Sequence, residues 1–115
     1  MVNKARANAE KNGIGNAGFY YADLYSDEVK DTQWIKQQYN KLLLDPPRSG
    51  AAGILHYIKR MEVGRIVYVS CHPATLARDA GVLVNELGYK LTHAGVMDMF
   101  PHTAHVESIA LFEMD

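Results

Sequence analysis

The only cysteine of this chain, Cys71, lies where a predicted strand gives way to a predicted helix. Residues 65–70 (RIVYVS) are rich in β-branched and aromatic side chains, which predicts a buried strand. Pro73 suits the first turn of a helix, and Gly88 suits the left-handed residue that ends one. Ligands bind open α/β sheets at the carboxyl ends of strands, and a helix N-terminus stabilises a thiolate. Cys71 is therefore a candidate nucleophile, and the alternative is an inert buried thiol.

Three carboxylates occupy comparable positions. Asp23 and Asp45 end predicted strands, and Glu107 follows a loop that is rich in functional groups. Because the carboxyl ends of neighbouring parallel strands open onto one cleft, we expect Asp45 and Cys71 to share it. The alternatives are structural. An aspartate before proline commonly begins a turn, and Glu107 would then be a solvent-facing residue of a half-buried strand.

Two other chemistries can be tested on residue spacing. His102 and His105 are spaced for a shared face or loop, and either Cys71 or Asp98 could join them around a metal ion, as in a metal-dependent hydrolase. A clear third ligand is lacking, so no metal is predicted. A cysteine phosphatase needs a closer spacing between its cysteine and its arginine than that of Cys71 and Arg78. That misfit excludes the phosphatase.

The elements that must position these groups alternate along the chain. Helical patterns cover residues 1–12, a short stretch from 26 to 35, residues 50–61 and the segment after Pro73, while strand patterns cover residues 18–22, 41–45, 65–70, 89–94 and 106–113. Such alternation predicts helices layered on a sheet. The last two strands have no helix between them, so we expect an antiparallel hairpin with a long loop.

Composition limits the possible classes of function. A length of 115 residues suits one domain. Lys and Arg total 12 against 13 Asp and Glu, so the net charge of −1 does not indicate nucleic-acid binding, although a local basic patch would suffice. A single cysteine forms no internal disulfide, and neither a signal peptide nor a transmembrane stretch is visible. The chain is expected to be soluble and cytoplasmic.

Three segments together carry a family resemblance. They are residues 44–50 (LDPPRSG), 68–79 (YVSCHPATLARD) and 98–107 (DMFPHTAHVE). In this order and spacing they resemble the RNA (uracil-5-)-methyltransferases, and the similarity is greatest to the 23S ribosomal RNA branch. The similarity runs from Met1 to the end of the chain.

The resemblance implies a covalent mechanism with S-adenosylmethionine as the methyl donor. In the family, the cysteine at the position of Cys71 adds to C6 of a target uracil. The carboxylate at the position of Glu107 then removes the C5 proton before the cysteine leaves. Asp45 is implied to lie between the cofactor and the target base, and Asp23 to contact the adenosine part of the cofactor. The implied partner is RNA, with 23S rRNA as substrate, and its uracil must be unstacked or flipped out.

The chain also departs from the family. The family usually has asparagine after the cysteine, and this chain has His72 there. His72 either assists thiolate formation or is a neutral replacement that points away from the site. The glycine-rich turn and the ribose-binding acid of the family have no counterpart here. An iron–sulfur cluster is not expected either, because one cysteine cannot hold a group that needs several. Residues 1–115 are therefore predicted to be the C-terminal part of a methyltransferase catalytic domain, inactive when isolated.

The implied fold is α/β, a partial Rossmann-like S-adenosylmethionine-dependent methyltransferase fold with a mostly parallel sheet. It would keep strands 3 to 7 of the family and lack strands 1 and 2. The order of strands in the family's sheet then places the strand at 41–45 beside the strand at 65–70, which is followed by the strands at 106–113 and 89–94. The strand at 18–22 should pair with the open edge of 41–45 or with another copy. The alternative to an enzyme is a non-catalytic half-domain that forms oligomers through this edge.

Overall fold

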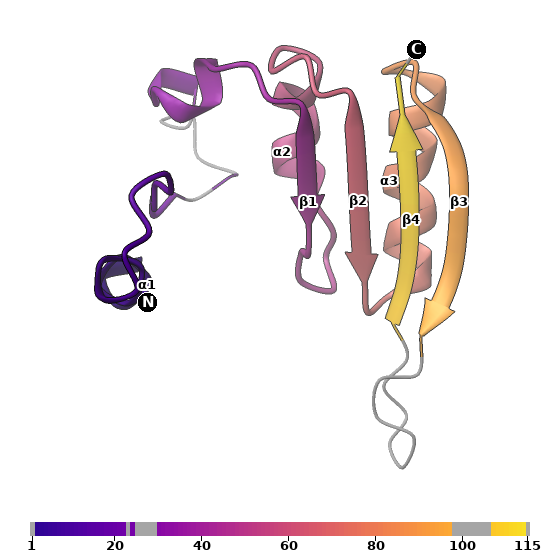
Figure 1. The fold of residues 1–115 in the computed structure, drawn as a ribbon. Helices are drawn as coiled ribbons and strands as arrows, with labels where there is room; N and C mark the ends of the chain where they lie inside the picture. Colours follow the sequence, from indigo (N-terminus) through magenta and orange to yellow (C-terminus); the bar gives the residue numbers. More distant parts are fainter. Residues whose placement is uncertain (1, 23, 25–29, 98–106, 115) are drawn as a thin grey trace.

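The computed structural model describes residues 2–22, 24, 30–97 and 107–114. Among these residues, four strands form one sheet in the order β1-β2-β4-β3 (Figure 1). The elements are α1 (Val2–Lys11), a 3₁₀ helix (Trp34–Lys36), β1 (Lys41–Leu44), α2 (Ala52–Ile58), β2 (Arg65–Ser70), α3 (Pro73–Asn85), β3 (Lys90–Met97) and β4 (Glu107–Glu113).

The sheet has the predicted strand order and orientation. β1 pairs in parallel with β2, while β4 runs antiparallel to both β2 and β3. Of the described strands, β1, β2 and β3 therefore point the same way and β4 points back, as the arrows in Figure 1 show. The prediction of a mostly parallel sheet with an antiparallel C-terminal hairpin is confirmed.

Proline and glycine set the ends of the two helices that lie on the sheet. Pro73 is the first residue of α3, where a missing N–H costs no hydrogen bond. Gly88, beyond the end of α3, has a positive φ of 82°. α2 covers Ala52–Ile58 rather than the predicted 50–61, because Gly50 adopts a left-handed φ of 89° that is incompatible with a right-handed helix.

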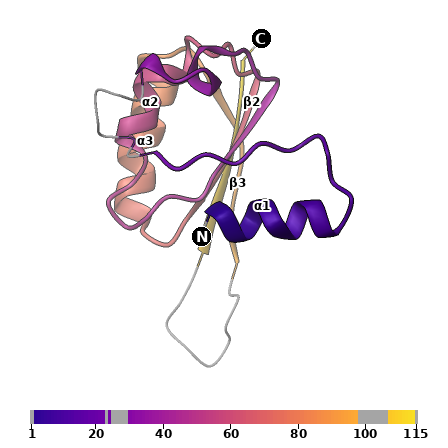
Figure 2. The ribbon, with the colours of Figure 1, turned by 90° about the vertical axis from the view of Figure 1, so that its left-hand side faces the viewer.

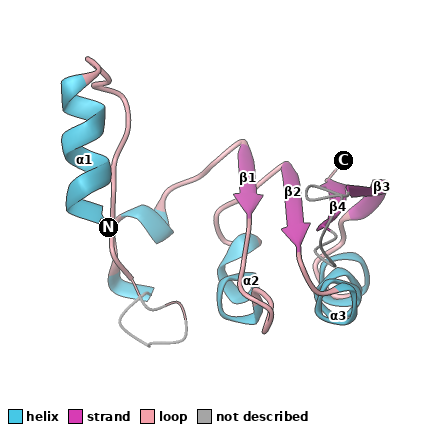
Figure 3. Ribbon diagram, turned by 90° about the horizontal axis from the view of Figure 1, so that it is seen from below, coloured by secondary structure: helices cyan, strands magenta, loops and turns pink. Residues whose placement is uncertain are grey.

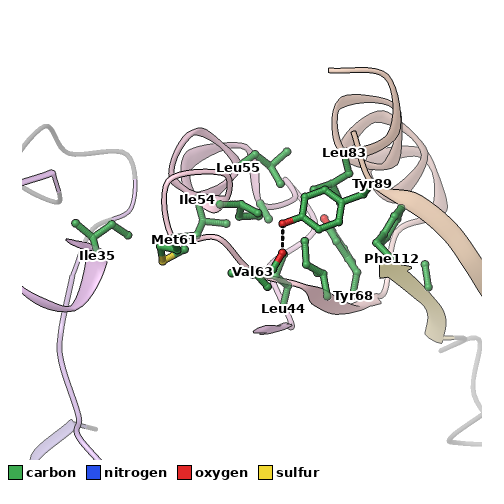
Figure 4. Packing of buried hydrophobic residues seen from close by; sticks show 14 residues of the cluster. Ile35, Leu44, Ile54, Leu55, Met61, Val63, Tyr68, Leu83, Tyr89 and Phe112 are labelled. Carbon is green, nitrogen blue, oxygen red and sulfur yellow. Dashed lines mark hydrogen bonds between the residues drawn. The ribbon is translucent and has the colours of Figure 1, made fainter. Parts of the chain in front are cut away.

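The core lies between the sheet and helices α2 and α3, which cover one face of it (Figures 1 and 3). Ile66 and Tyr68 of β2 and Phe112 of β4 point to these helices and are fully buried. Apolar side chains of α2 and α3 pack on them, as Figure 4 shows. The Tyr89 hydroxyl donates to the Val63 carbonyl at 2.5 Å, and burial raises the pKa of Tyr89.

The opposite face of the sheet is open within the described part of the chain. Val67 and Val69 alternate along β2 with its buried residues, so they point to this face, where they are half-buried. Leu43 of β1 is 68% exposed. Helix α1 lies on this side of the sheet but beyond β1, so it does not cover the strands (Figures 2 and 3).

One predicted strand is wrong. Residues 18–22 form no strand, and β1 is an edge strand of the described sheet. The Arg6 guanidinium donates to the Phe19 carbonyl at 2.9 Å, and Tyr20 stacks on Trp34 with ring centroids 6.4 Å apart. A strand needs a ladder of backbone partners, and here a side chain takes the carbonyl. Pairing of this segment with another copy stays a prediction.

The short helix predicted from 26 to 35 is only partly open to comparison. Residues 25–29 lie outside the described part of the chain. The 3₁₀ helix overlaps the C-terminal end of the predicted range and buries Ile35 completely. None of the helices in the described ranges is both long enough and apolar enough to cross a bilayer.

Candidate active site

Three of the four predicted site residues come to one end of the sheet. Asp45 follows the last residue of β1, Cys71 follows the last residue of β2, and Glu107 begins β4. Because β4 runs antiparallel to β2, its start lies beside the end of β2. Asp45 and Cys71 therefore lie at the same edge of the sheet, while the expectation that they share one cleft stays a prediction. Asp23 lies outside the described residues.

Cys71 and Glu107 lie at the same end of the β2–β4 ladder. The last pair of that ladder is Ser70 with Ser108. Cys71 directly follows Ser70 and Glu107 directly precedes Ser108, so both residues adjoin this last pair. Backbone pairing thus brings a thiol and a carboxylate together from two distant parts of the sequence.

The thiol and this carboxylate have different surroundings. Cys71 is free and exposed. Glu107 is half-buried, and its Oε2 atom is shielded from solvent without a hydrogen-bond partner among the described residues. A buried carboxylate oxygen with no partner costs free energy. Among the described residues, this oxygen thus stays available to accept a hydrogen bond from a group outside them.

Ser70 holds the backbone around Cys71. Its hydroxyl donates to the His72 carbonyl at 2.9 Å and accepts from the His72 N–H at 3.0 Å. Ser70 is only 3% exposed, so this bridge is shielded from water. One side chain thus closes a turn across Cys71, while the cysteine itself remains exposed.

His72 caps helix α3. Its Nδ1 atom accepts from the Thr75 N–H at 3.3 Å, and its carbonyl accepts from the Thr75 hydroxyl at 3.0 Å and the Leu76 N–H at 3.2 Å. In this contact the ring nitrogen acts as the hydrogen-bond acceptor of an N-cap. Asparagine is a favoured residue at this N-cap position. This geometry accounts for His72 as a helix cap that can replace asparagine, and whether it also assists the thiol stays a prediction.

Asp45 begins a constrained loop. Its side chain is exposed and makes no capping hydrogen bond within the described part of the chain, which argues against the turn-cap alternative. Pro46 and Pro47 follow and restrict the backbone. The Gly50 N–H then donates to the Pro47 carbonyl at 2.8 Å and closes a turn. The loop thus presents a carboxylate at the carboxyl edge of the sheet.

Behind this edge lies a buried network that the sequence motifs did not reveal. Asp79 of α3 is 1% exposed, and its Oδ2 accepts from the Tyr68 hydroxyl at 2.5 Å and the Ala51 N–H at 2.8 Å. Its Oδ1 accepts from Arg78 at 3.1 Å. Burial raises the pKa of Tyr68, and the adjacent Asp79 carboxylate raises it further. A signal did exist, because Asp79 falls on the same helical stripe as the buried Leu83.

The metal-site alternative depends on Asp98, His102 and His105, which lie outside the described residues. Within the described ranges, no three histidine, cysteine, aspartate or glutamate side chains are arranged to hold a metal ion. The described residues therefore leave the hydrolase alternative untested.

Sequence comparison identifies related proteins over almost the whole chain. The profile of the tRNA (Uracil-5-)-methyltransferase family matches residues 1–114. The 23S rRNA (uracil(1939)-C(5))-methyltransferases RlmD of Xanthomonas campestris pv. campestris and Stenotrophomonas maltophilia are each 61% identical over 113 residues. Each match covers 98% of this chain and 25% of the relative, so the chain spans about a quarter of the length of the curated relatives it matches.

Solved structures agree with the sequence comparison. The Pyrococcus abyssi tRNA (uracil-54, C5)-methyltransferase, in complex with S-adenosyl-L-homocysteine, has a TM-score of 0.72 and 36% identity, covering 96% of this chain and 26% of that one. M. capricolum TrmK, at 17% identity and a TM-score of 0.63, covers 97% of this chain and 46% of its own, and shares the fold alone. The sheet is therefore part of a Rossmann-like methyltransferase fold. With a family profile that matches nearly its full length, the chain belongs to the tRNA (Uracil-5-)-methyltransferase family.

Proposed function

We propose that this chain is the C-terminal part of a catalytic domain that methylates C5 of uridine in RNA, with S-adenosylmethionine as donor and 23S rRNA as substrate. The observation that carries the proposal is that an exposed thiol, Cys71, and a half-buried carboxylate, Glu107, both adjoin the last residue pair of the β2–β4 ladder. Relatives at 61% identity that are named 23S rRNA methyltransferases support the choice of substrate.

Cys71 is the nucleophile in this proposal. Its thiolate sulfur forms a bond to C6 of the uracil, and the π electrons of the C5–C6 bond move to C5 and the conjugated carbonyl. C5 thereby becomes a carbon nucleophile. A base inside a helical stack cannot reach a side chain in this way, so the uracil is flipped out. The exposure of Cys71 beyond the end of β2 supports access for such a base.

Glu107 is the general base. Once C5 carries both its hydrogen and a methyl group, the carboxylate takes the C5 proton. The electron pair of that C–H bond re-forms the C5–C6 double bond, and the thiolate leaves C6, which regenerates the nucleophile. The unpartnered Oε2 atom supports this role, because no competing hydrogen bond within the described residues occupies the oxygen that would accept the proton.

The groups at this edge fit S-adenosylmethionine. The donor carries positive charge, and Asp45 offers an exposed carboxylate at the carboxyl end of β1, where ligands of open α/β sheets bind. When bound, the cofactor supplies the methyl group. We assign Asp45 to the junction between cofactor and target base, and Asp23 to the adenosine part. The S-adenosyl-L-homocysteine in the Pyrococcus abyssi enzyme supports the choice of cofactor.

The test uses a chimera in which this chain replaces the matching quarter of the Xanthomonas campestris relative. Methyl transfer from labelled S-adenosylmethionine to a 23S rRNA transcript is measured. Cys71→Ala should abolish transfer, and retained transfer would overturn the assigned nucleophile. Glu107→Gln should accumulate a covalent protein–RNA adduct, seen as a slow band on a denaturing gel, because the C5 proton cannot leave.

Glu113→Gln is the matched control for the base. Glu113 lies at the other end of β4, points to the same face as Glu107 and has a side chain that is 35% exposed. Its substitution should leave transfer within about twofold and form no adduct, since surface changes are small effects. An equal loss of transfer in both glutamine variants would contradict the role of Glu107.

We further propose that the 115 residues alone do not transfer methyl groups. Asp45 is the one described residue to which we assign a cofactor contact, and a single carboxylate is a weak site. Cofactor titration and transfer assays on the isolated chain check this. Measurable methylation of a uracil-containing RNA by the chain alone would refute it.

The second candidate function is a non-catalytic half-domain that forms oligomers through β1. The favouring observation is the free edge of this strand in the described sheet, where Leu43 is 68% exposed. A hollow of about 440 Å³, lined in part by Trp34, Lys41 and Leu42, runs beside the same strand. Light scattering with cofactor titration separates the two candidates. A stable oligomer without cofactor affinity favours the half-domain, and a monomer that binds cofactor contradicts it.

A further inference from the structure

The network around Asp79 joins the two segments that carry the proposed site. On one side, Asp79 Oδ2 accepts from the Ala51 N–H at 2.8 Å, and Ala51 ends the loop that begins at Asp45. On the other side, the same oxygen accepts from the hydroxyl of Tyr68, in the strand that ends just before Cys71. Asp79 itself lies on α3, which starts directly after the Cys71 turn.

Arg78 makes a second tie to the same loop. Its Nη2 atom donates to the Ser49 carbonyl at 2.7 Å and to Asp79 Oδ1 at 3.1 Å, and its Nε atom donates to the same Oδ1 at 3.2 Å. The planar guanidinium holds these two nitrogens in fixed directions, which the single nitrogen of a lysine cannot do. The loop is therefore held at two backbone groups, the Ser49 carbonyl and the Ala51 N–H. Tyr68, Arg78 and Asp79 together are called the loop clamp below.

Gly50 allows this close approach. It lies between the two held groups with a φ of +89°, a conformation that side-chain-bearing residues rarely adopt. A Cβ atom at Gly50 would overlap the Arg78 guanidinium and would lie 2.7 Å from Asp79 Oδ2. The backbone of the loop thus lies directly against the charged pair, with no room for an intervening side chain.

We infer that the loop clamp is a positioning device that fixes Asp45 relative to Cys71. The inference rests on the proposed function, which makes these two residues parts of one site. The chain from Asp45 to the clamp contains two prolines and a closed turn, so it has little freedom to move. At its start, Leu44 is paired in register with Tyr68, and the hydroxyl of the same tyrosine donates to Asp79, which accepts from Ala51 at the other end of the loop.

Stability alone does not account for a carboxylate at position 79. Asp79 is 1% exposed and is paired with an arginine whose side chain is 51% exposed. Replacing buried ion pairs by apolar residues of similar volume is often neutral or stabilising. A carboxylate there instead supplies acceptors for three donors of fixed direction, which an apolar side chain cannot do. The clamp is thus better suited to setting geometry than to adding stability.

The first test compares two tyrosines in the same chimera. Tyr68→Phe removes a buried hydroxyl from the clamp, and Tyr89→Phe removes a buried hydroxyl that donates to the Val63 carbonyl instead. Both lose one hydrogen bond in the same core. We expect Tyr68→Phe to lower methyl transfer by about tenfold or more and to raise the KM for S-adenosylmethionine, because small misplacements are costly in catalysis. Tyr89→Phe should change neither value by more than about twofold.

The second test uses two arginines whose side chains are equally exposed. Arg78 and Arg65 are each 51% exposed, and each pairs with one carboxylate, those of Asp79 and Glu113. Arg78→Ala should reproduce the loss of transfer and the rise in KM, while Arg65→Ala should not. Arg78→Lys should rescue little, because lysine lacks the planar fork. The midpoint temperature of thermal unfolding is measured for each variant, so that the activity of each clamp variant is compared with that of its control at similar stability.

The outcomes separate this inference from the proposed function. If the unsubstituted chimera transfers methyl groups and Glu107→Gln traps the adduct, the proposed function stands. The loop clamp is then overturned when Tyr68→Phe and Arg78→Ala lose no more activity than their controls at matched stability. It is supported when they lose transfer and their controls do not. A chimera with neither transfer nor adduct overturns both proposals.

Discussion

The sheet half of the molecule (residues 41–97 and 107–114) and its N-terminal segment (residues 2–22 and 30–36) are stabilised in different ways. In the sheet half, four strands share one ladder, and side chains such as Tyr68 and Phe112 are fully buried beneath two helices. In the N-terminal segment, Tyr20 is 64% exposed and Tyr21 is 89% exposed. Strand pairing is therefore confined to the sheet half among the described residues, and the N-terminal segment adds to the core chiefly Ile35 of the 3₁₀ helix.

The difference shows which part of the proposed site is built into the described fold. Cys71 and Glu107 sit at the ends of paired strands, so the ladder that stabilises the sheet also sets their separation. Asp45 is tied to the same framework through Ala51 and Asp79. We therefore expect changes in the sheet half to affect stability and chemistry strongly, and changes at the exposed residues of the N-terminal segment to affect stability weakly.

The largest effect is expected for Phe112→Ala, in the middle of the sheet half. Phe112 is fully buried, and truncation of such a residue costs about 3–5 kcal/mol, because packing is lost and a cavity remains. Urea unfolding followed by circular dichroism measures the change. Leu91→Ala is the control, because Leu91 is 49% exposed on β3. A loss below about 1 kcal/mol for Phe112→Ala would break the contrast between the regions.

The next effect is expected for Gly50→Ala, which tests the backbone of the Asp45 loop. The positive φ and the overlap with Arg78 should together cost about 1–3 kcal/mol in the free energy of unfolding. Gly15→Ala, in the N-terminal segment, is the matched control, because a Cβ there meets nothing within 4 Å and needs no positive φ. Equal stability of the two variants, measured in urea, would show that the loop is not constrained as described.

A smaller effect is expected at the cap of α3. His72→Ala removes the acceptor for the Thr75 N–H and should lower the free energy of unfolding by about 1 kcal/mol. His72→Asn restores a side-chain acceptor, so its free energy of unfolding should stay within about 0.3 kcal/mol of that of the unsubstituted chain. Thermal denaturation of the three proteins checks the order. A His72→Asn variant as unstable as His72→Ala would contradict the capping role.

The smallest effect is expected for Tyr21→Ala in the N-terminal segment. With an exposed fraction of 89%, this side chain loses little burial on truncation. The free energy of unfolding should change by no more than about 0.5 kcal/mol. Equilibrium unfolding measures it under the same conditions as Phe112→Ala. A loss comparable with that of the core variant would show that both regions are equally packed, and the comparison would fail.

Much of the local structure could be predicted from the sequence. The strand at 65–70, the helix that begins at Pro73 and the left-handed Gly88 were all predictable from residue types and spacing. The strand order could not be predicted that way and came from the family resemblance. The strand at 18–22 was predicted wrongly, because its aromatic residues favour β structure only where a partner supplies the backbone ladder.

The candidate site was likewise predictable from the sequence only in part. The sequence by itself determined that Cys71 would follow a strand and precede a helix, since proline and β-branched residues act on the chain within a few positions. Only the tertiary structure decided that Glu107 would come to the same end of the ladder as Cys71 and that Asp79 would hold the Asp45 loop. These contacts join residues far apart in the chain, and the hydrogen bonds that create them exist only once the sheet and α3 have packed together.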